Sequence, residues 1–217
     1  MKMKILLLSI FTSTLFISST YSQNVFGFKG GMQLAKITGV GDVPKSLLTT
    51  IQLKGVAIFP LTDEVTITPS LGYSGKGYRW NNLTFTDQVG NSLGEGDAIG
   101  LFNYIQLTVP LSYKIIAGQN QEYYLGAGPY FSYAVSAKGK IKHVSLTGGD
   151  ETWDMFKDNA YKRTDAGIAI EISSRLKRKY LISFNTDIGL ADVSNDGGGK
   201  IKQLAAGISV GYVFNGK

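Results

Sequence analysis

Apolar and polar residues alternate along most of this chain with a period of two. In the stretch QLAAGISVGYVF, residues 203–214, every second residue from Leu204 is apolar, and the residues between are small or polar. This period is typical of a β-strand with two unlike faces. Seven further segments show the same alternation, namely residues 25–37, 50–59, 65–77, 103–115, 122–139, 163–173 and 179–190. No helix-period segment of convincing length interrupts them.

The connections between these segments alternate in length. Short connections are predicted at 60–64, 117–121 and 173–179, and longer ones at 37–49, 76–102, 138–162 and 190–200. Segments of about ten residues match the length of a transmembrane β-strand, and outer-membrane barrels have short periplasmic turns and longer outer loops. The pattern predicts an all-β fold, an eight-stranded antiparallel up-and-down transmembrane β-barrel.

The polar face of the segments would line the barrel interior. Opposite charges enclosed in a narrow eight-stranded barrel can pair, whereas an unpaired buried charge would be prohibitively costly. Three lysines and four carboxylates lie on this face. We predict that they form an interior ionic network of Lys29, Lys54, Lys114, Glu122, Asp165, Glu171 and Asp187.

The other face is apolar on all eight segments and would meet lipid. Aromatic residues near the segment ends predict a girdle at both membrane interfaces. They are Phe26, Phe59, Tyr73, Tyr113, Tyr123, Tyr180, Tyr212 and Phe214. Alternation alone does not say which face is wet, so a soluble exported ligand-binding barrel with the apolar face inside stays open as an alternative.

The first 22 residues have the order of a secretory signal peptide. Lys2 and Lys4 precede an apolar run from Ile5 to Ile17, and small or polar residues follow through Ser22. We predict cleavage near Ser22, which divides the chain into a signal peptide (1–22) and a barrel domain (23–217). Sec-type export followed by insertion into the outer membrane is the expected route.

Composition narrows the classes of partner. The chain has a formal net charge of +6, and removal of the predicted leader would leave 20 basic against 16 acidic residues, a net of +4. This excess is too diffuse for nucleic-acid binding, which shows clustered basic residues. The chain has no cysteine, which excludes disulfides and thiolate metal sites. We expect a monomer with no cofactor, in contact with outer-membrane lipid and with protein partners of the cell envelope.

Several stretches together resemble the PorT-like outer-membrane β-barrel family. They are FGFKGGMQLAKI, TPSLGYSGKGYRW, NYIQLTVPLSYKI, YYLGAGPYFSYAVSAKG, TDAGIAIEI, DIGLADVS and ISVGYVF, in the family's order and spread over most of residues 24–214. The resemblance implies an eight-stranded barrel in the outer membrane of a Gram-negative bacterium. It also implies a link to protein secretion, since the family's namesake is linked to secretion across that membrane.

A few motifs suggest chemistry. His143 and Ser145, with Glu151 nearby, resemble the His-x-Ser and carboxylate of an outer-membrane lipid A deacylase, although the flanking residues do not match. Acidic clusters at 148–154 and 192–199 are interpreted as hydrophilic loops, with calcium binding as the alternative, although neither has the full spacing of an EF-hand. The basic run 175–179 is interpreted as a solvated periplasmic turn that could meet anionic groups.

These observations favour a non-enzymatic outer-membrane protein. We expect a structural or interaction role with loops displayed at the surface, in support of secretion or adhesion. The alternatives left open are an outer-membrane lipid-modifying esterase and the soluble ligand-binding barrel.

Overall fold

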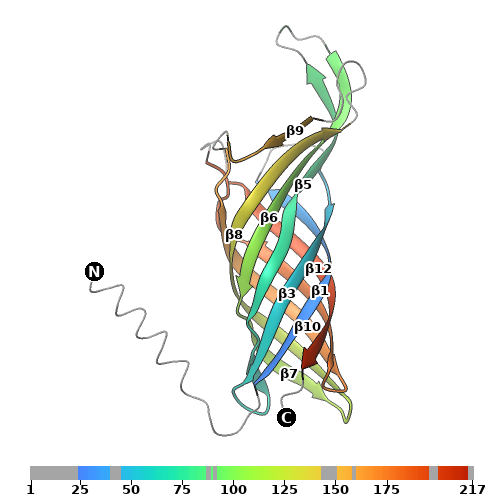
Figure 1. Cartoon of the computed structure of the whole chain (residues 1–217), viewed down its shortest axis with the longest axis vertical. Coiled ribbons are helices and arrows are strands. Elements are labelled where there is room, and N and C mark those ends of the chain that lie inside the picture. Colours follow the sequence, from blue (N-terminus) through green and yellow to red (C-terminus); the bar gives the residue numbers. More distant parts are fainter. Residues whose placement is uncertain are drawn as a thin grey trace, which may run out of the picture.

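The computed structural model describes residues 24–39, 45–86, 89, 92–142, 151–157, 160–195 and 200–214. The predicted signal peptide and most of the His143 region lie outside these residues. Within the described residues the fold is all-β (Figure 1). The strands are β1 (Val25–Thr38), β2 (Lys45–Ser46), β3 (Leu48–Pro60), β4 (Val65–Ile67), β5 (Ser70–Thr86), β6 (Ser92–Thr108), β7 (Leu111–Ala117), β8 (Gln121–Lys142), β9 (Glu151–Asp154), β10 (Thr164–Leu176), β11 (Tyr180–Gly189) and β12 (Lys202–Phe214).

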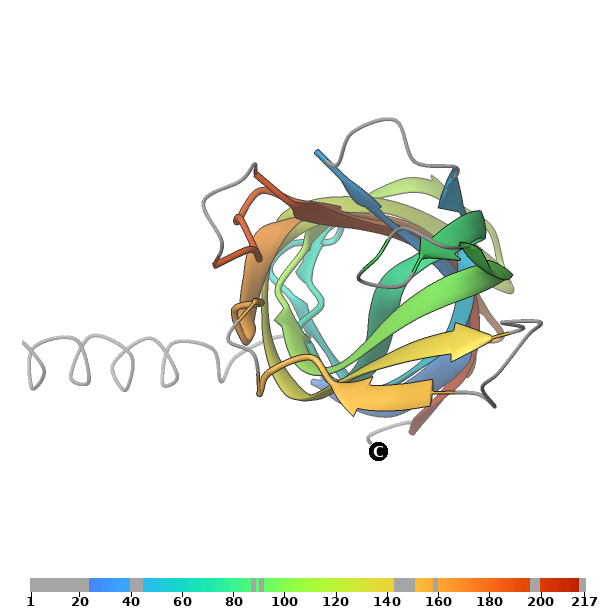
Figure 2. The ribbon, with the colours of Figure 1, turned by 90° about the horizontal axis from the view of Figure 1, so that it is seen from above.

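The strand pairing returns to its starting point. Going round, β1 pairs with β3, then come β5, β6, β8, β10, β11 and β12, and β12 pairs back with β1. Every one of these pairings is antiparallel, which confirms the predicted all-β antiparallel fold. Viewed from above, the strands form a closed ring (Figure 2). A sheet closed in this way leaves no long unpaired edge.

The described residues contain twelve strands, not the eight predicted, and proline explains part of the difference. Pro69 separates β4 from β5, and Pro110 separates β6 from β7, because proline has no N–H to donate to the ladder. The wall stays hydrogen-bonded at both breaks. Thr68 N–H donates to the Pro110 carbonyl and Ala57 N–H to the Pro69 carbonyl. The other two additional strands, β2 and β9, are short pieces on the long-loop side.

The two ends of the fold differ, as the connection lengths predict. Tight turns at 61–64, 118–120 and 177–179 form one end, which we call the short-turn end. The opposite, long-loop end is more strand-rich than expected. The predicted loop 76–102 is wrong, because β5 and β6 continue as a paired hairpin through most of it. The predicted loop 138–162 likewise contains the end of β8 and all of β9. Figure 1 shows the β5–β6 hairpin rising above the other strands.

Side-chain exposure confirms which face of the wall is apolar and outward. On β12, Ile208 and Val210 are exposed, whereas Gln203 and Ser209 are buried. The same alternation runs along β1, where Phe28 faces out and Lys29 faces in. A soluble barrel that buries its apolar face does not fit this arrangement.

Of the residues predicted to form the aromatic girdle, nearly all lie at one rim of the barrel. All of them except Tyr73 lie close to the short-turn end, where Phe26 packs edge-on against Phe59 and Tyr180 against Tyr212. The prediction of a girdle at both rims from these residues is therefore wrong. The strands extend well beyond the alternating segments at the long-loop end. Residues at the ends of those segments therefore do not mark the rim on that side.

Candidate functional site in the barrel interior

Lys76 on β5 is the central cation of the barrel interior. Its side chain is fully buried. The Nζ atom lies 3.1 Å from Asp165 Oδ2 on β10 and 3.5 Å from Asp187 Oδ2 on β11. It also lies over the ring of Tyr130, 3.9 Å from the centroid, which adds a cation–π contact.

Neighbouring polar groups hold the two aspartates in place. The Tyr130 hydroxyl donates to Asp165 Oδ2 at 3.0 Å, and Gln106 Nε2 donates to Asp187 Oδ2 at 2.8 Å. Lys54 interacts electrostatically with the same Asp187. Charge-assisted hydrogen bonds of this kind compensate part of the cost of removing charges from water.

The contacts of this cluster cross the barrel. In the ring of pairings, β5 and β11 are four strands apart in either direction, so the Lys76–Asp187 pair joins opposite walls. Gln52 on β3 donates to Asn185 on β11 at 2.8 Å, three strands away. Side chains therefore bridge the interior instead of lining an open channel.

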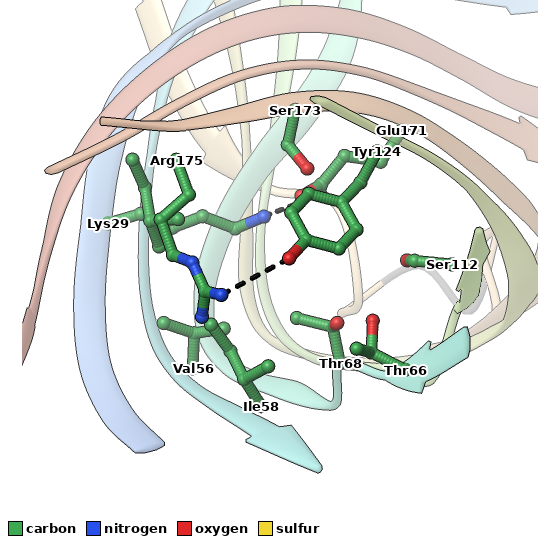
Figure 3. Close-up of a pocket in the computed structure, with 11 residues that line it drawn as sticks. Lys29, Val56, Ile58, Thr66, Thr68, Ser112, Tyr124, Glu171, Ser173 and Arg175 are labelled. Carbon is green, nitrogen blue, oxygen red and sulfur yellow. Dashed lines mark hydrogen bonds and ion pairs between the residues drawn. The ribbon is translucent and has the colours of Figure 1, made fainter. Parts of the chain in front are cut away.

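A second charged layer lies nearer the short-turn end. Lys29 pairs with Glu171, and Arg175 pairs with Glu122, which is also 3.6 Å from Lys114. Figure 3 shows Arg175 directed at the Tyr124 hydroxyl, to which it donates at 3.2 Å. The cavity here measures about 20 Å³, room for about one water molecule.

Two apolar clusters also pack in the interior. At the short-turn end, Val56, Ile58, Leu181 and Val213 form a buried cluster. At the long-loop end, a larger cluster contains Ile37, Tyr78, Phe102, Tyr104, Ala134, Ala137 and Met155. The ring of Tyr78 also covers Gly100, where a Cβ atom would lie 2.4 Å from the ring. The long-loop end of the interior is therefore mainly apolar, whereas apolar and charged side chains lie together near the short-turn end.

All seven residues predicted for the ionic network lie in this interior. Lys29, Lys54, Asp165 and Asp187 are buried, and the other three are half-buried. The structure brings Lys54 and Asp165 together around Asp187 by way of Lys76, pairs Lys29 with Glu171, and places Lys114 beside Glu122.

Sequence reasoning missed two cations of the network. The sequence predicts Lys76 at the start of the loop 76–102 and Arg175 in the basic turn 175–179. With these two added, five cations face four carboxylates. The missed signal was the alternation, which continues past Gly75 to Lys76 and past Ser173 to Arg175.

None of the motifs considered for enzymatic or metal chemistry forms a site among the residues that the structure describes. His143 and Ser145 lie outside the described residues, and Glu151 is the first residue of β9. No group of three or more potential metal ligands occurs among the residues that the structure describes. In the same residues, no α-helix has the length and hydrophobicity needed to cross a bilayer.

Asp192, from the acidic cluster 192–199, instead fixes the loop between β11 and β12. Its Oδ1 accepts hydrogen bonds from the backbone N–H groups of Ser194 and Ile201, each at 3.0 Å. Its other carboxylate oxygen lies 3.7 Å from Lys162 Nζ. The Ser194 hydrogen bond, followed by that of Ile201, holds the pKa of Asp192 below its usual value.

We predict that this loop loosens only in acid. A carboxyl whose pKa is lowered by folding contributes stability that is present above the unfolded-state pKa and lost as pH falls through the lowered value. The amide shifts of Ser194 and Ile201 should therefore titrate together below the ordinary aspartate range. In Asp192→Asn neither amide should titrate, and cleavage by trypsin after Lys200 should be faster at neutral pH. Titration of both amides in the variant would contradict this account.

Comparison with known protein families explains why the apolar face of the sheet points outward. A family described as outer membrane protein beta-barrel domain matches residues 21–195. The chain belongs to this family. It is an outer-membrane β-barrel protein, and the outward apolar face is the face that such proteins turn to lipid. The match does not extend to the PorT-like group in particular.

Solved structures of small outer-membrane barrels are also similar. Ail of Yersinia pestis is 15% identical, covers 89% of this chain and 100% of its own, and has a TM-score of 0.44. OprG of Pseudomonas aeruginosa is 13% identical, with coverage of 90% and 98% and a TM-score of 0.46. Neisserial surface protein A is 12% identical, with coverage of 88% and 98% and a TM-score of 0.45. No curated protein matches the sequence.

Proposed function

We propose that this protein is a monomeric, non-enzymatic, eight-stranded outer-membrane barrel that acts through its long-loop end. After Sec-type export, the barrel would serve as a closed anchor and the β5–β6 and β8–β9 extensions would contact other molecules at the cell surface. Support for secretion, as the PorT-like resemblance implies, or adhesion is the role that this arrangement fits.

The observation that carries the proposal is the Lys76–Asp187 pair. It spans opposite strands of the wall with both side chains almost completely buried, so the middle of the barrel is filled. The cost of separating such a pair without water makes an opening through the middle unfavourable. A barrel that does not conduct has to act with its exposed ends.

The extensions supply the surface for that action. Among the described residues, β5 pairs beyond Trp80 with β6 and with no other strand, so this part of the hairpin extends past the neighbouring strands. On the other side of β6, β8 continues as far as Lys142 and pairs with β9. Loops placed on a rigid scaffold are the usual location of binding residues.

We predict no steady conductance from the folded protein in planar phosphatidylcholine bilayers. The preparation should first show heat-modifiable mobility on a denaturing gel, which reports a closed barrel. In Asp187→Ala only part of the protein should show the heat-modifiable mobility of a folded barrel. The bilayer recordings of this variant should show flickering current, because the ion pair between Lys76 and β11 is lost. Stable wild-type channels would contradict the closed-anchor proposal, and release of the protein from membranes without detergent would contradict membrane insertion.

A further inference from the structure

We propose that three lysines on β8 bind the phosphate head groups of membrane lipid at the long-loop rim. We call Lys138, Lys140 and Lys142 the lysine row. The inference rests on the proposed function, because it needs the outward apolar face to be embedded in lipid.

The lower part of β8 sets the level of the lipid. Phe131, Tyr133 and Val135 are exposed and face outward, while Ser132 and Ala134 are buried. The outward set is apolar without interruption, as expected for contact with hydrocarbon. Val135 is the last residue of this set before the lysine row begins.

A β-bulge then changes which residues face outward. On β6, Tyr104 pairs with Ala134 and Asn103 pairs with Ser136, so Val135 is the extra residue. Asn103 Nδ2 donates to the Ser136 hydroxyl at 2.8 Å. A bulge of this kind redirects the side chains that follow it.

The redirected strand turns the lysine row outward. Ala137 and Gly139 are buried, and Ala137 packs in the apolar cluster at the long-loop end. In the alternation of the lower part, even-numbered residues such as Ser132 face in. Without the extra residue, the three lysines would therefore point into this apolar cluster. The bulge places them instead on the lipid-facing side, directly beyond Val135.

The row has the dimensions of a head-group contact. Alternate residues of a strand are about 6.7 Å apart, so the row covers about 13 Å beyond the apolar belt. Cations in this position attract anionic lipid, and the attraction weakens with salt. A free phosphate would have no reason to prefer this boundary, whereas a lipid phosphate is held there by its own acyl chains.

Two acidic residues lie opposite the lysine row. Asp97 on β6 is opposite Lys142, and Asp154 on β9 is opposite Lys138. Arg79 donates to Asp97 at 2.7 Å. Cations therefore outnumber the carboxylates that the strand register places directly opposite the row.

The test measures lipid retention by the folded protein. Wild type is placed in phosphatidylcholine nanodiscs that contain a minor fraction of lipid A with two phosphates, and native mass spectrometry counts the lipids that stay bound. We expect enrichment of lipid A in wild type. Replacement of all three lysines of the row by glutamine should reduce that enrichment by about tenfold or more at low salt.

A matched variant separates this site from general charge. Lys177→Gln, Arg178→Gln and Lys179→Gln together remove the same number of charges at the short-turn end and should leave the enrichment unchanged, as should arginine in place of each lysine of the row. Inorganic phosphate at millimolar concentration should not displace the lipid.

Three outcomes would overturn the inference. They are equal losses in the two glutamine variants, displacement by inorganic phosphate, and no enrichment in wild type. If wild type showed no heat-modifiable folding or insertion, the proposed function would fail first, which distinguishes the two failures.

Discussion

Replacement of Lys76 by methionine should destabilise the barrel by about 3–5 kcal/mol, the usual cost of removing one partner of a buried ion pair. Methionine keeps much of the apolar stem but removes the charge that faces Asp165 and Asp187. The two carboxylates, both nearly inaccessible to solvent, would then be left close together without a cation. The free energy of unfolding in guanidinium chloride, measured on protein refolded into phospholipid vesicles, reports the loss.

Two further variants make this prediction specific. The triple variant Lys76→Met, Asp165→Asn, Asp187→Asn removes all three charges and should recover at least half of the lost stability. Lys162→Met breaks a partly exposed pair with Asp192 and should cost less than about 1 kcal/mol. If Lys76→Met unfolded at the wild-type denaturant concentration, the buried network would not be a source of stability.

A charge at Ile208 should prevent or strongly reduce membrane assembly. Ile208 lies in the middle of β12, is 58% exposed, and pairs with Met32 and Phe184 on the neighbouring strands, which are also exposed. An arginine at the bilayer midplane costs about 2–4 kcal/mol in barrels of this type. The heat-modifiable fraction of Ile208→Arg after refolding into vesicles should fall well below that of wild type.

The adjacent residue is the control. Ser209 is buried, and its hydroxyl has no hydrogen-bond partner among the described residues. Ser209→Ala should therefore fold and unfold within about 1 kcal/mol of wild type, because a buried hydroxyl without a partner contributes little. Tolerance of arginine at 208 together with failure of alanine at 209 would mean that the wall faces the other way.

Much of the wall was predictable because its environment is uniform. Within the bilayer every outward residue meets hydrocarbon, so the period of two is regular from Phe26 to Leu34 and from Leu204 to Val210. Seven charged interior residues followed from that alternation alone. The turn at 61–64 was predictable for a similar reason, since a short polar break separates two regular strands.

Prediction failed where the environment changes along a strand. Toward the long-loop end the apolar residues Phe102 and Tyr104 point inward, which reverses the rule that held lower down on β6 and β8. Lys76 lies opposite Phe102 at this change of environment, and glycines on both sides disguise its place in the alternation. The bulge at Val135 depends on pairing with β6, and no local sequence signal announces it.

The sequence separation of the interior ion pairs has a consequence for biogenesis. Lys29 and Glu171 are 142 residues apart, and Lys76 and Asp165 are 89 apart. A nascent wall that contains only the first strands would hold lysines with no carboxylate to meet them, so inserting it into hydrocarbon strand by strand would be costly. Insertion should become favourable only when β10 and β11 arrive, which makes assembly close to all-or-none. Chains truncated before β10 should remain outside the bilayer, available to chaperones and proteases.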